Sequence, residues 1–265
     1  MLPLKDYNPT TSVAWVTVVL IAVNVVIFLS EPITGSARTQ ATYFACHGAI
    51  PYEVTHGKRA VDALSQGVRF ESDQDIAFAA LEQSCPRKNV WLSILTSMFL
   101  HGSIAHIGFN MLFLWVFGNN IEDRLGRMRY IIFYLLCGIA AALLQVFMEP
   151  RSGAPMVGAS GAISGVMGGY LVLYPRVRVY TLLPLGFFIT TVALPAWAML
   201  IYWMVLQLAG GLTGILSEES GGVAFWAHVG GFLAGVVLIK FFAKRNHVDE
   251  HQGHPWRPRQ VGWPS

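Results

Sequence analysis

The sequence predicts an all-α polytopic membrane protein with six transmembrane helices, and three observations support this fold class. The chain of 265 residues is 54% hydrophobic and only 12% charged, about half the charged fraction of an ordinary soluble domain. Its charges gather between long apolar runs. Those runs reach the roughly 17–25 residues that a helix needs to cross the bilayer core. The small net charge of +3 gives no indication of nucleic-acid binding.

Six apolar runs are long enough to form these helices. They cover residues 13–29, 103–121, 130–148, 157–174, 185–216 and 223–242. The fifth run exceeds one span, so we expect a re-entrant or interfacial lead-in, with Pro195 marking a break or a start. The first run could be a signal peptide, but its flank is barely positive and no small-residue cleavage site follows closely. A retained helix is therefore favoured.

The distribution of basic residues predicts the orientation. If the N-terminus is cytoplasmic, Lys and Arg concentrate in the cytoplasmic segments, as they do in most membrane proteins. These residues are Lys5, Arg124, Arg127, Arg129, Arg176, Arg178, Lys240, Lys244 and Arg245. An even number of helices returns the C-terminus to the same side, so we expect both termini in the cytoplasm.

The chain divides into a membrane core over residues 1–243 and a basic cytoplasmic tail over residues 244–265, which we expect to be poorly ordered. The tail carries His247, His251 and His254, whose spacing could suit a metal on a helix. Nearby prolines and the lack of cysteine favour a solvated tail instead.

A long outer loop over residues 31–90 separates the first two predicted helices. Residues 52–83 give no interpretable pattern, whereas residues 91–100 have the amphiphilic character of a segment at the membrane interface. Cys46 and Cys85 both fall in this loop. They could form a disulfide in an oxidising compartment or remain free thiols.

Polar residues inside the predicted spans are candidates for function, because such groups are costly in lipid. They are His106, Asn110, Ser160 and His228. Three of them, on three different helices, lie near the outer ends of their spans. At about 1.5 Å rise per residue they share one layer roughly 5–8 Å below the outer surface. Asn110 follows His106 by four residues and therefore shares its helix face.

Glycines predict that the fourth and sixth helices approach closely. Gly161 and Gly165 are four residues apart, as are Gly231 and Gly235, and small residues at this spacing let membrane helices pack backbone to backbone. Ser160 could then reach a histidine within hydrogen-bonding distance, as nucleophilic catalysis requires. Without polar residues at matching depth, the same glycines would indicate helix packing alone.

The polar layer predicts a serine–histidine dyad. His228 can take the proton from the Ser160 hydroxyl, and no acidic residue within the spans could complete a triad. Attack on a peptide carbonyl produces an oxyanion that needs hydrogen-bond donors. The candidates are the Asn110 amide, the His106 imidazole and the backbone N–H of Ser160 in the first turn of its helix.

Four motifs occur in order along the predicted core. They are His101-x4-His106-x3-Asn110, Gly118-x3-Glu122-x3-Gly126 followed by Tyr130 and Tyr134, Gly158-Ala159-Ser160-Gly161, and Ala227-His228-x2-Gly231-x3-Gly235. Together they resemble the motifs of the rhomboid family of intramembrane serine proteases, in its prokaryotic six-helix type. Each motif alone is weak evidence, whereas the ordered set is highly specific.

The resemblance implies a rhomboid-like helix bundle that cleaves single-span or polytopic membrane proteins within a transmembrane segment, near its outer end and usually after a small residue. It implies Ser160 as nucleophile, His228 as general base, and His106 and Asn110 in the oxyanion hole, with no cofactor. It also implies a mobile fifth helix over residues 195–216 and a capping loop over residues 217–222, which admit substrate from the lipid.

Other residues of the motifs are expected to support the site. They are His101, Gly158, Gly161, Ser164, Gly231 and Gly235. His101 is interpreted as a structural cap that binds loop backbone. Ser164 departs from the family pattern, because many members carry there an aromatic ring that lies against the histidine. How His228 is held is therefore open, with a hydrogen bond from Ser164 as one possibility.

Parts of the pattern also admit other interpretations. Metal catalysis would require an HExxH motif or an equivalent acid, which His101 and His106 lack. Glu122 beside Arg124 and Arg127 predicts an ion cluster at the inner face. A catalytically inactive rhomboid-like protein that binds membrane clients would have lost the serine or the histidine. A small transporter would need a further buried acid or inverted repeats.

The predicted compartment is the plasma membrane of a bacterium or archaeon, with the site toward the outer side. Six spans, no seventh helix and no targeting presequence favour this interpretation. His47 and His56 in the outer loop are expected to be solvated.

Overall fold

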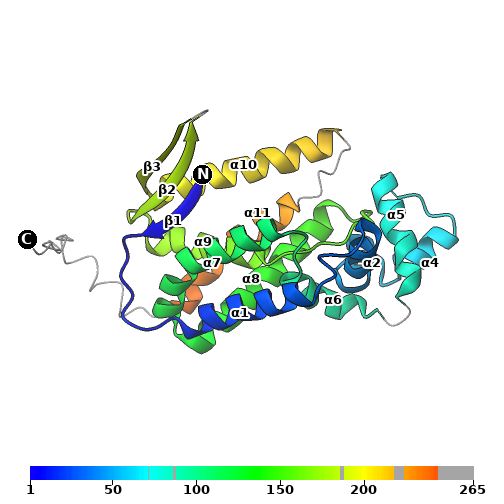
Figure 1. The fold of residues 1–265 in the computed structure, drawn as a ribbon, viewed down its shortest axis with the longest axis horizontal. Coiled ribbons are helices and arrows are strands. Elements are labelled where there is room, and N and C mark those ends of the chain that lie inside the picture. The colour runs from blue at the N-terminus through cyan, green and yellow to red at the C-terminus, as the bar shows by residue number, and fades with distance from the viewer. Residues whose placement is uncertain (71, 86–87, 186–187, 218–223, 244–265) are drawn as a thin grey trace, which may run out of the picture.

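The computed structural model describes the chain except residues 71, 86–87, 186–187, 218–223 and 244–265 (Figure 1). The predicted tail over residues 244–265 lies outside the described residues. So does most of the predicted capping loop over residues 217–222.

Helices form at all six predicted apolar runs. They are α1 (Trp15–Ser30), α7 (Ile104–Leu125), α8 (Arg127–Met148), α9 (Ser160–Leu173), α10 (Ala196–Ser217) and α11 (Phe225–Phe242). Among the described residues, α7, α8, α10 and α11 are long and apolar enough to cross a membrane, whereas α1 and α9 are shorter apolar helices. A mostly helical membrane bundle is therefore confirmed. Six complete crossings and the orientation of the termini stay predictions.

Helix α9 lies at the centre of the bundle. It packs against α7, α8 and α11, and every residue from Gly161 to Tyr170 is buried. A helix that is apolar on all sides belongs inside a bundle rather than on its surface. A Cβ atom at Gly231 would collide with the carbonyl oxygen of Gly161, and one at Gly235 with that of Gly165. The predicted close approach of these two helices is confirmed.

A three-stranded antiparallel sheet corrects the all-α prediction. Its strands are β1 (Leu2–Asp6), β2 (Arg178–Leu185) and β3 (Phe188–Pro195), in the order β1-β2-β3. Figure 1 shows the sheet beside the start of α10. The predicted lead-in to the fifth helix is thus a strand, because a short apolar run rich in β-branched residues cannot be told from helix by hydropathy alone. Pro195 is the last residue of β3, and α10 starts directly after it. Of the two predicted roles, a break or a start, Pro195 thus marks the start of the helix.

The C-terminal end of α7 holds the start of α1. The Glu122 carboxylate accepts hydrogen bonds from the backbone N–H groups of Val16 (2.9 Å) and Thr17 (2.7 Å) and from the Thr17 hydroxyl (2.9 Å). A carboxylate at a helix N-terminus satisfies unpaired N–H groups and favours the helix dipole. Glu122 therefore caps α1, in place of the ion cluster predicted for it.

Residues 31–90 fold into a helical unit that we call the α2–α5 domain. Its elements are α2 (Ala37–His47), α3 (Pro51–His56), α4 (Ala60–Ser65), α5 (Asp73–Leu81) and the short η1 (Glu82–Ser84). They lie together at one end of the molecule in Figure 1. The domain leads into α6 (Val90–Thr96) and η2 (Ser97–Phe99). The stretch 52–83, which the sequence left unassigned, therefore contains most of α3, all of α4 and α5, and part of η1.

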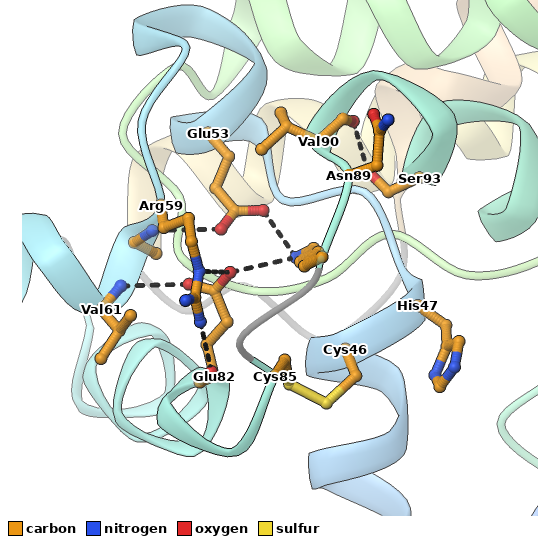
Figure 2. A network of polar contacts seen from close by, with 12 residues as sticks. Cys46, His47, Glu53, Arg59, Val61, Glu82, Cys85, Asn89, Val90 and Ser93 are labelled. Carbon is orange, nitrogen blue, oxygen red and sulfur yellow. Dashed lines mark hydrogen bonds and ion pairs between the residues drawn. A yellow bond between two sulfur atoms is a disulfide. The ribbon is translucent and has the colours of Figure 1, made fainter.

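A disulfide and buried charges hold the α2–α5 domain together (Figure 2). Cys46 and Cys85 are bonded, which settles the open alternative of free thiols. The Lys88 ammonium lies 2.5 Å from a Glu53 oxygen and 3.8 Å from Glu82, and Arg59 lies 3.2 Å from Glu82. Burial, and then the neighbouring Glu82, raise the pKa of Glu53, while Lys88 opposes that shift. The side chains of Lys88, Glu53 and Glu82 are thus out of water, whereas Arg59 keeps part of its surface exposed.

Candidate functional site

Ser160 and His228 meet where α9 and α11 begin. Ser160 is the first residue of α9, and His228 lies in the first turn of α11. The Nε2 atom of His228 is 2.8 Å from the Oγ atom of Ser160. The close glycine packing of the two helices places these side chains within reach. The hydrogen-bonding distance predicted from the sequence is present.

Gln207 of α10 completes the surroundings of His228, and the sequence reasoning missed it. Its Oε1 atom lies 2.7 Å from Nδ1 of His228. An amide oxygen only accepts hydrogen bonds, so Nδ1 carries the proton and Nε2 is free to accept from the Ser160 hydroxyl. Only an acidic residue was expected as a third member beside the serine and the histidine. The available signal was a strongly polar residue within an apolar run.

Trp203 lies one turn before Gln207 and packs beside the same histidine. The ring centroids of Trp203 and His228 are 5.7 Å apart. Ser164, the possible partner of His228 in the sequence analysis, donates a hydrogen bond of 2.6 Å to the carbonyl oxygen of Ser160. The histidine is thus flanked by an aromatic ring from α10, while Ser164 supports the first turn of α9.

His106 and Asn110 face the same site from α7. The N–H group of Gly102 lies 3.4 Å from Nδ1 of His106, which places the proton of a neutral ring on Nε2. The Asn110 amide donates to the carbonyl oxygen of His106 at 3.1 Å. Gly158 has a φ of 129°, and a Cβ atom there would lie 2.9 Å from His106 Nε2. Glycine is thus required on both conformational and steric grounds.

His101 is buried behind this layer and acts as the predicted cap. Its ring Nδ1 lies 3.3 Å from the carbonyl oxygen of Phe99, and its backbone N–H donates to the Glu31 carboxylate at 3.1 Å. Burial, with a smaller effect of His106, lowers the pKa of His101 to about 4. Burial also raises the pKa of Glu31 to about 7, against the effect of the hydrogen bond from His101. The ring of His101 is therefore neutral at physiological pH.

One cavity of about 480 Å³ joins these residues. Ser160, His228, His106, Asn110 and Ser164 all line it. A further lining residue, Gln145 of α8, was not predicted. Its Oε1 atom accepts the backbone N–H of Ala227 at 3.0 Å and so ties the first turn of α11 to α8.

The histidines of the α2–α5 domain stand apart from this site. His47 and His56 are exposed, and each binds a carbonyl oxygen one turn earlier in its own helix. Their predicted solvation is confirmed. Within the described residues, no three His, Cys, Asp or Glu side chains gather as a metal site. The histidines of the predicted tail lie outside those residues.

The sequence model of the family described as Rhomboid domain matches residues 88–245, which is more than half of the chain. The chain belongs to the rhomboid family. All the motif residues at the cavity lie inside the matched range, whereas the α2–α5 domain lies almost entirely before it. The family suggested by the four motifs is thus confirmed.

Similar proteins come from bacteria and from organelles. The chain is 31% identical over 160 residues to Rhomboid protease GluP of Bacillus subtilis, which covers 60% of this chain and 28% of that protein. It is 29% identical over 157 residues to the mitochondrial Rhomboid protein 1 of Saccharomyces cerevisiae, covering 58% and 42%. The chloroplastic Rhomboid-like protein 11 of Arabidopsis thaliana is 29% identical over 159 residues, covering 58% and 53%. The chain thus spans from about a quarter to about half of these relatives.

Proposed function

We propose that this chain is an intramembrane serine endopeptidase that cleaves transmembrane segments of other membrane proteins. The observation that carries the proposal is the 2.8 Å contact between Ser160 Oγ and His228 Nε2 inside a cavity of a rhomboid domain. The contact of His228 Nδ1 with Gln207 supports it, because that contact leaves Nε2 unprotonated and able to act as a base.

The reaction follows from this geometry in two steps. Ser160 Oγ attacks the carbonyl carbon of the scissile peptide bond, and its proton passes to His228 Nε2. The histidine then gives that proton to the leaving amine, so that the C–N bond breaks and an acyl-enzyme remains. Water, deprotonated by His228, then attacks the carbonyl carbon of the ester. His228 returns that proton to Ser160 Oγ as the ester C–O bond breaks, and the second product leaves with a new carboxyl terminus. Gln207 acts as a positioning residue, since it fixes the ring through Nδ1 in both steps.

Hydrogen-bond donors beside Ser160 are suited to the oxyanion. His106 offers its Nε2–H group, because its Nδ1 atom accepts from Gly102. The Asn110 amide uses one of its two hydrogens on the His106 carbonyl and retains the other. The backbone N–H of Ser160 lies in the first turn of α9, where the helix dipole favours negative charge. Removal of one such donor typically costs about 10²–10³ in rate.

Substrate access is assigned to α10. Over an 18-residue apolar stretch of α10, 28% of the residues are buried inside the protein. The corresponding stretches of α7, α8 and α11 are 44% buried. Trp203 and Gln207 both belong to α10 and contact the histidine. Displacement of α10 would therefore release His228, so the helix must return before the chemistry begins.

The proposed setting is a multi-pass protein with both termini in the cytoplasm and the dyad toward the outer side. A prokaryotic plasma membrane fits the bacterial relative, although mitochondrial and chloroplastic proteins also match. The partners are single-span or polytopic membrane proteins within the bilayer.

The proposal is tested with a tagged single-span substrate in liposomes. We expect the wild-type chain to cut it, and Ser160→Ala and His228→Ala to cut nothing. A serine-reactive fluorophosphonate should label the wild type alone, and metal chelators should change neither result. If the wild type neither cuts nor labels, the proposal is refuted in favour of a client-binding rhomboid-like protein.

A further inference from the structure

The hairpin of β2 and β3 leaves the bundle at the end opposite the dyad. Ser160 starts α9, and β2 follows the end of that helix at Leu173. At about 1.5 Å rise per residue, α9 separates its two ends by about 20 Å. Figure 1 shows the two strands reaching to the side of the bundle, beside the start of α10. The hairpin therefore lies near the opposite boundary of the apolar helices.

The base of the hairpin is fixed to the bundle and to α10. Asp6 of the paired strand β1 is buried, and its carboxylate accepts hydrogen bonds from the Tyr170 hydroxyl of α9 (2.6 Å) and the Asn120 amide of α7 (2.8 Å). The backbone N–H of Ala196, at the start of α10, donates to the carbonyl oxygen of Val177 at 2.8 Å. The bundle itself thus sets the depth of the sheet in the membrane.

The hairpin and α10 form one uncharged stretch. From Val179 to Ser217 the sequence has no Asp, Glu, Lys, Arg or His. Val192 of β3 is 37% exposed, and Trp197, two residues after the end of β3, is 52% exposed. Tryptophan concentrates at the boundary between lipid and water. The surface of the hairpin thus continues the apolar surface of the membrane helix that follows it.

The free edge of β3 argues against both water and hydrocarbon as its surroundings. Among the described residues β3 pairs with β2 alone, so its other edge presents unpaired N–H and C=O groups. In water such an edge is usually protected by charged side chains, and β3 has none. Open sheet edges do not occur in the hydrocarbon core, because nothing there binds these groups. The headgroup layer supplies both apolar contact and hydrogen-bonding partners.

The exposed charges of the sheet are all basic. Lys5, Arg176 and Arg178 are exposed near the base of the hairpin, whereas Asp6, the one acidic residue of the three strands, is buried. Anionic lipid headgroups attract Lys and Arg residues that lie beside a membrane span. Charge and apolar surface therefore indicate the same occupant, a lipid surface.

We propose that the β2–β3 hairpin is an interfacial anchor, which lies in the headgroup layer on the membrane face opposite the dyad and binds anionic lipid through Lys5, Arg176 and Arg178. The inference goes beyond the proposed protease function and does not depend on it. Because β3 runs directly into α10, the anchor holds the first turn of the access helix at one depth.

The first test measures the depth of Thr191, an exposed residue of β3. Thr191→Cys carries the fluorophore NBD, and the full chain is reconstituted in phosphatidylcholine vesicles. The native cysteines do not compete for the label, because Cys46 and Cys85 are bonded and Cys137 is buried. Quenchers are placed in the water, on the lipid headgroup or midway along the acyl chain.

Two further labelled positions serve as references for depth. Gln66→Cys is exposed in the α2–α5 domain and reports water, and Val205→Cys is 54% exposed on α10 and reports hydrocarbon. We expect the headgroup quencher to act on the Thr191 label at least about twofold more strongly than on either reference, as for an element at the headgroup boundary. A Thr191 label that behaves like either reference would overturn the proposal.

The second test measures lipid preference at the same label. The vesicles contain phosphatidylglycerol and phosphatidylcholine, and a shallow quencher is carried by one lipid or the other. We expect at least about twofold stronger quenching from phosphatidylglycerol, because basic residues beside a span attract anionic lipid. Replacing Lys5, Arg176 and Arg178 together by Gln should abolish that preference.

The matched control replaces one lysine and two arginines elsewhere. Arg38, Lys58 and Arg69 are exposed in the α2–α5 domain, and their joint replacement by Gln should leave the lipid preference unchanged. Equal quenching from both lipids without any charge substitution would overturn the proposed binding of anionic lipid. A preference that survives at Lys5, Arg176 and Arg178 replaced by Gln would overturn the role of these three residues.

Discussion

The bundle around α9 and the α2–α5 domain are stabilised in opposite ways. In the bundle, α9 and α11 pack through glycines, with Gly231 against the backbone of Gly161. In the domain, Cys46 is bonded to Cys85 and buried ion pairs surround Lys88. Lipid gives apolar helices no hydrophobic reason to associate, so close backbone packing must supply the contact energy. A small unit in water buries too little apolar surface and depends on covalent and ionic links.

The two regions meet at the segment before Ser160. The bundle contributes Ser160, the proposed nucleophile, at the start of α9, and the α2–α5 domain holds residues 152–156 through Asp75 and Ala49. A disulfide-linked unit thus fixes a loop at the mouth of a site that lies in the bundle. The comparison predicts that damage to the bundle removes catalysis outright, whereas damage to the domain impairs the placement of the loop before Ser160.

The largest effect is expected from Gly231→Ala. The added methyl group would collide with the carbonyl oxygen of Gly161 and push α11 away from α9. A displacement of about 1 Å at a reacting group can cost about 10²-fold in rate, and overpacking costs about 1–3 kcal/mol of stability. Cleavage rates and thermal unfolding in detergent measure both. Gly108→Ala on α7 is the control, because no atom lies within 4 Å of the new Cβ.

Wild-type cleavage by Gly231→Ala would show that the close approach of the two helices is not what brings the dyad together. The bundle would then keep its catalytic activity after a local change in packing, as is expected when the α2–α5 domain is altered.

Replacing both Cys46 and Cys85 by Ser should weaken the α2–α5 domain selectively. The disulfide joins residues separated by 39 positions, and removal of such a link costs about 2–4 kcal/mol. Limited proteolysis should cut the domain first, while fluorophosphonate labelling of Ser160 persists. Simultaneous loss of labelling and of protease resistance would mean that the two regions unfold as one unit.

Asp75→Ala addresses the junction itself. Its carboxylate accepts from three groups in residues 152–154, and an unsatisfied buried N–H group costs about 1–3 kcal/mol. We expect a several-fold loss of cleavage, less than for Gly231→Ala, with the disulfide still formed. Asp73→Asn on the same helix is the control, since Asp73 is exposed. Equal cleavage rates of Asp75→Ala and Asp73→Asn would show that the contact between the domain and residues 152–154 does not affect catalysis.

The sequence predicted the parts of the fold that hydropathy and spacing encode. The six helical runs, the glycine contacts and the approach of Ser160 to His228 follow from periodicity and from the cost of polar groups in lipid. The sheet could not be predicted in this way, because an apolar run rich in β-branched residues, such as the one ending at Pro195, is compatible with a helix and with a strand. The positions of Phe44 and Phe78 in the lining of the cavity could not be predicted either, since they depend on how a separate domain docks.

Gln207 is a residue of the site that the sequence likewise did not predict. Its substitution is expected to have the smallest effect among the tests of the comparison. Gln207→Leu removes the acceptor of His228 Nδ1 at nearly constant volume, so we expect kcat to fall about tenfold, as for the weaker acid–base contributions, with KM little changed. Gln207→Glu retains an acceptor at the same reach and should restore much of the rate. Leu208→Ala, at an exposed position of α10, is the control. A role in packing alone would be satisfied by leucine and not by glutamate. Full activity of Gln207→Leu would show that the rest of the bundle positions His228 without α10. The proposed link between the access helix and the dyad would then be refuted.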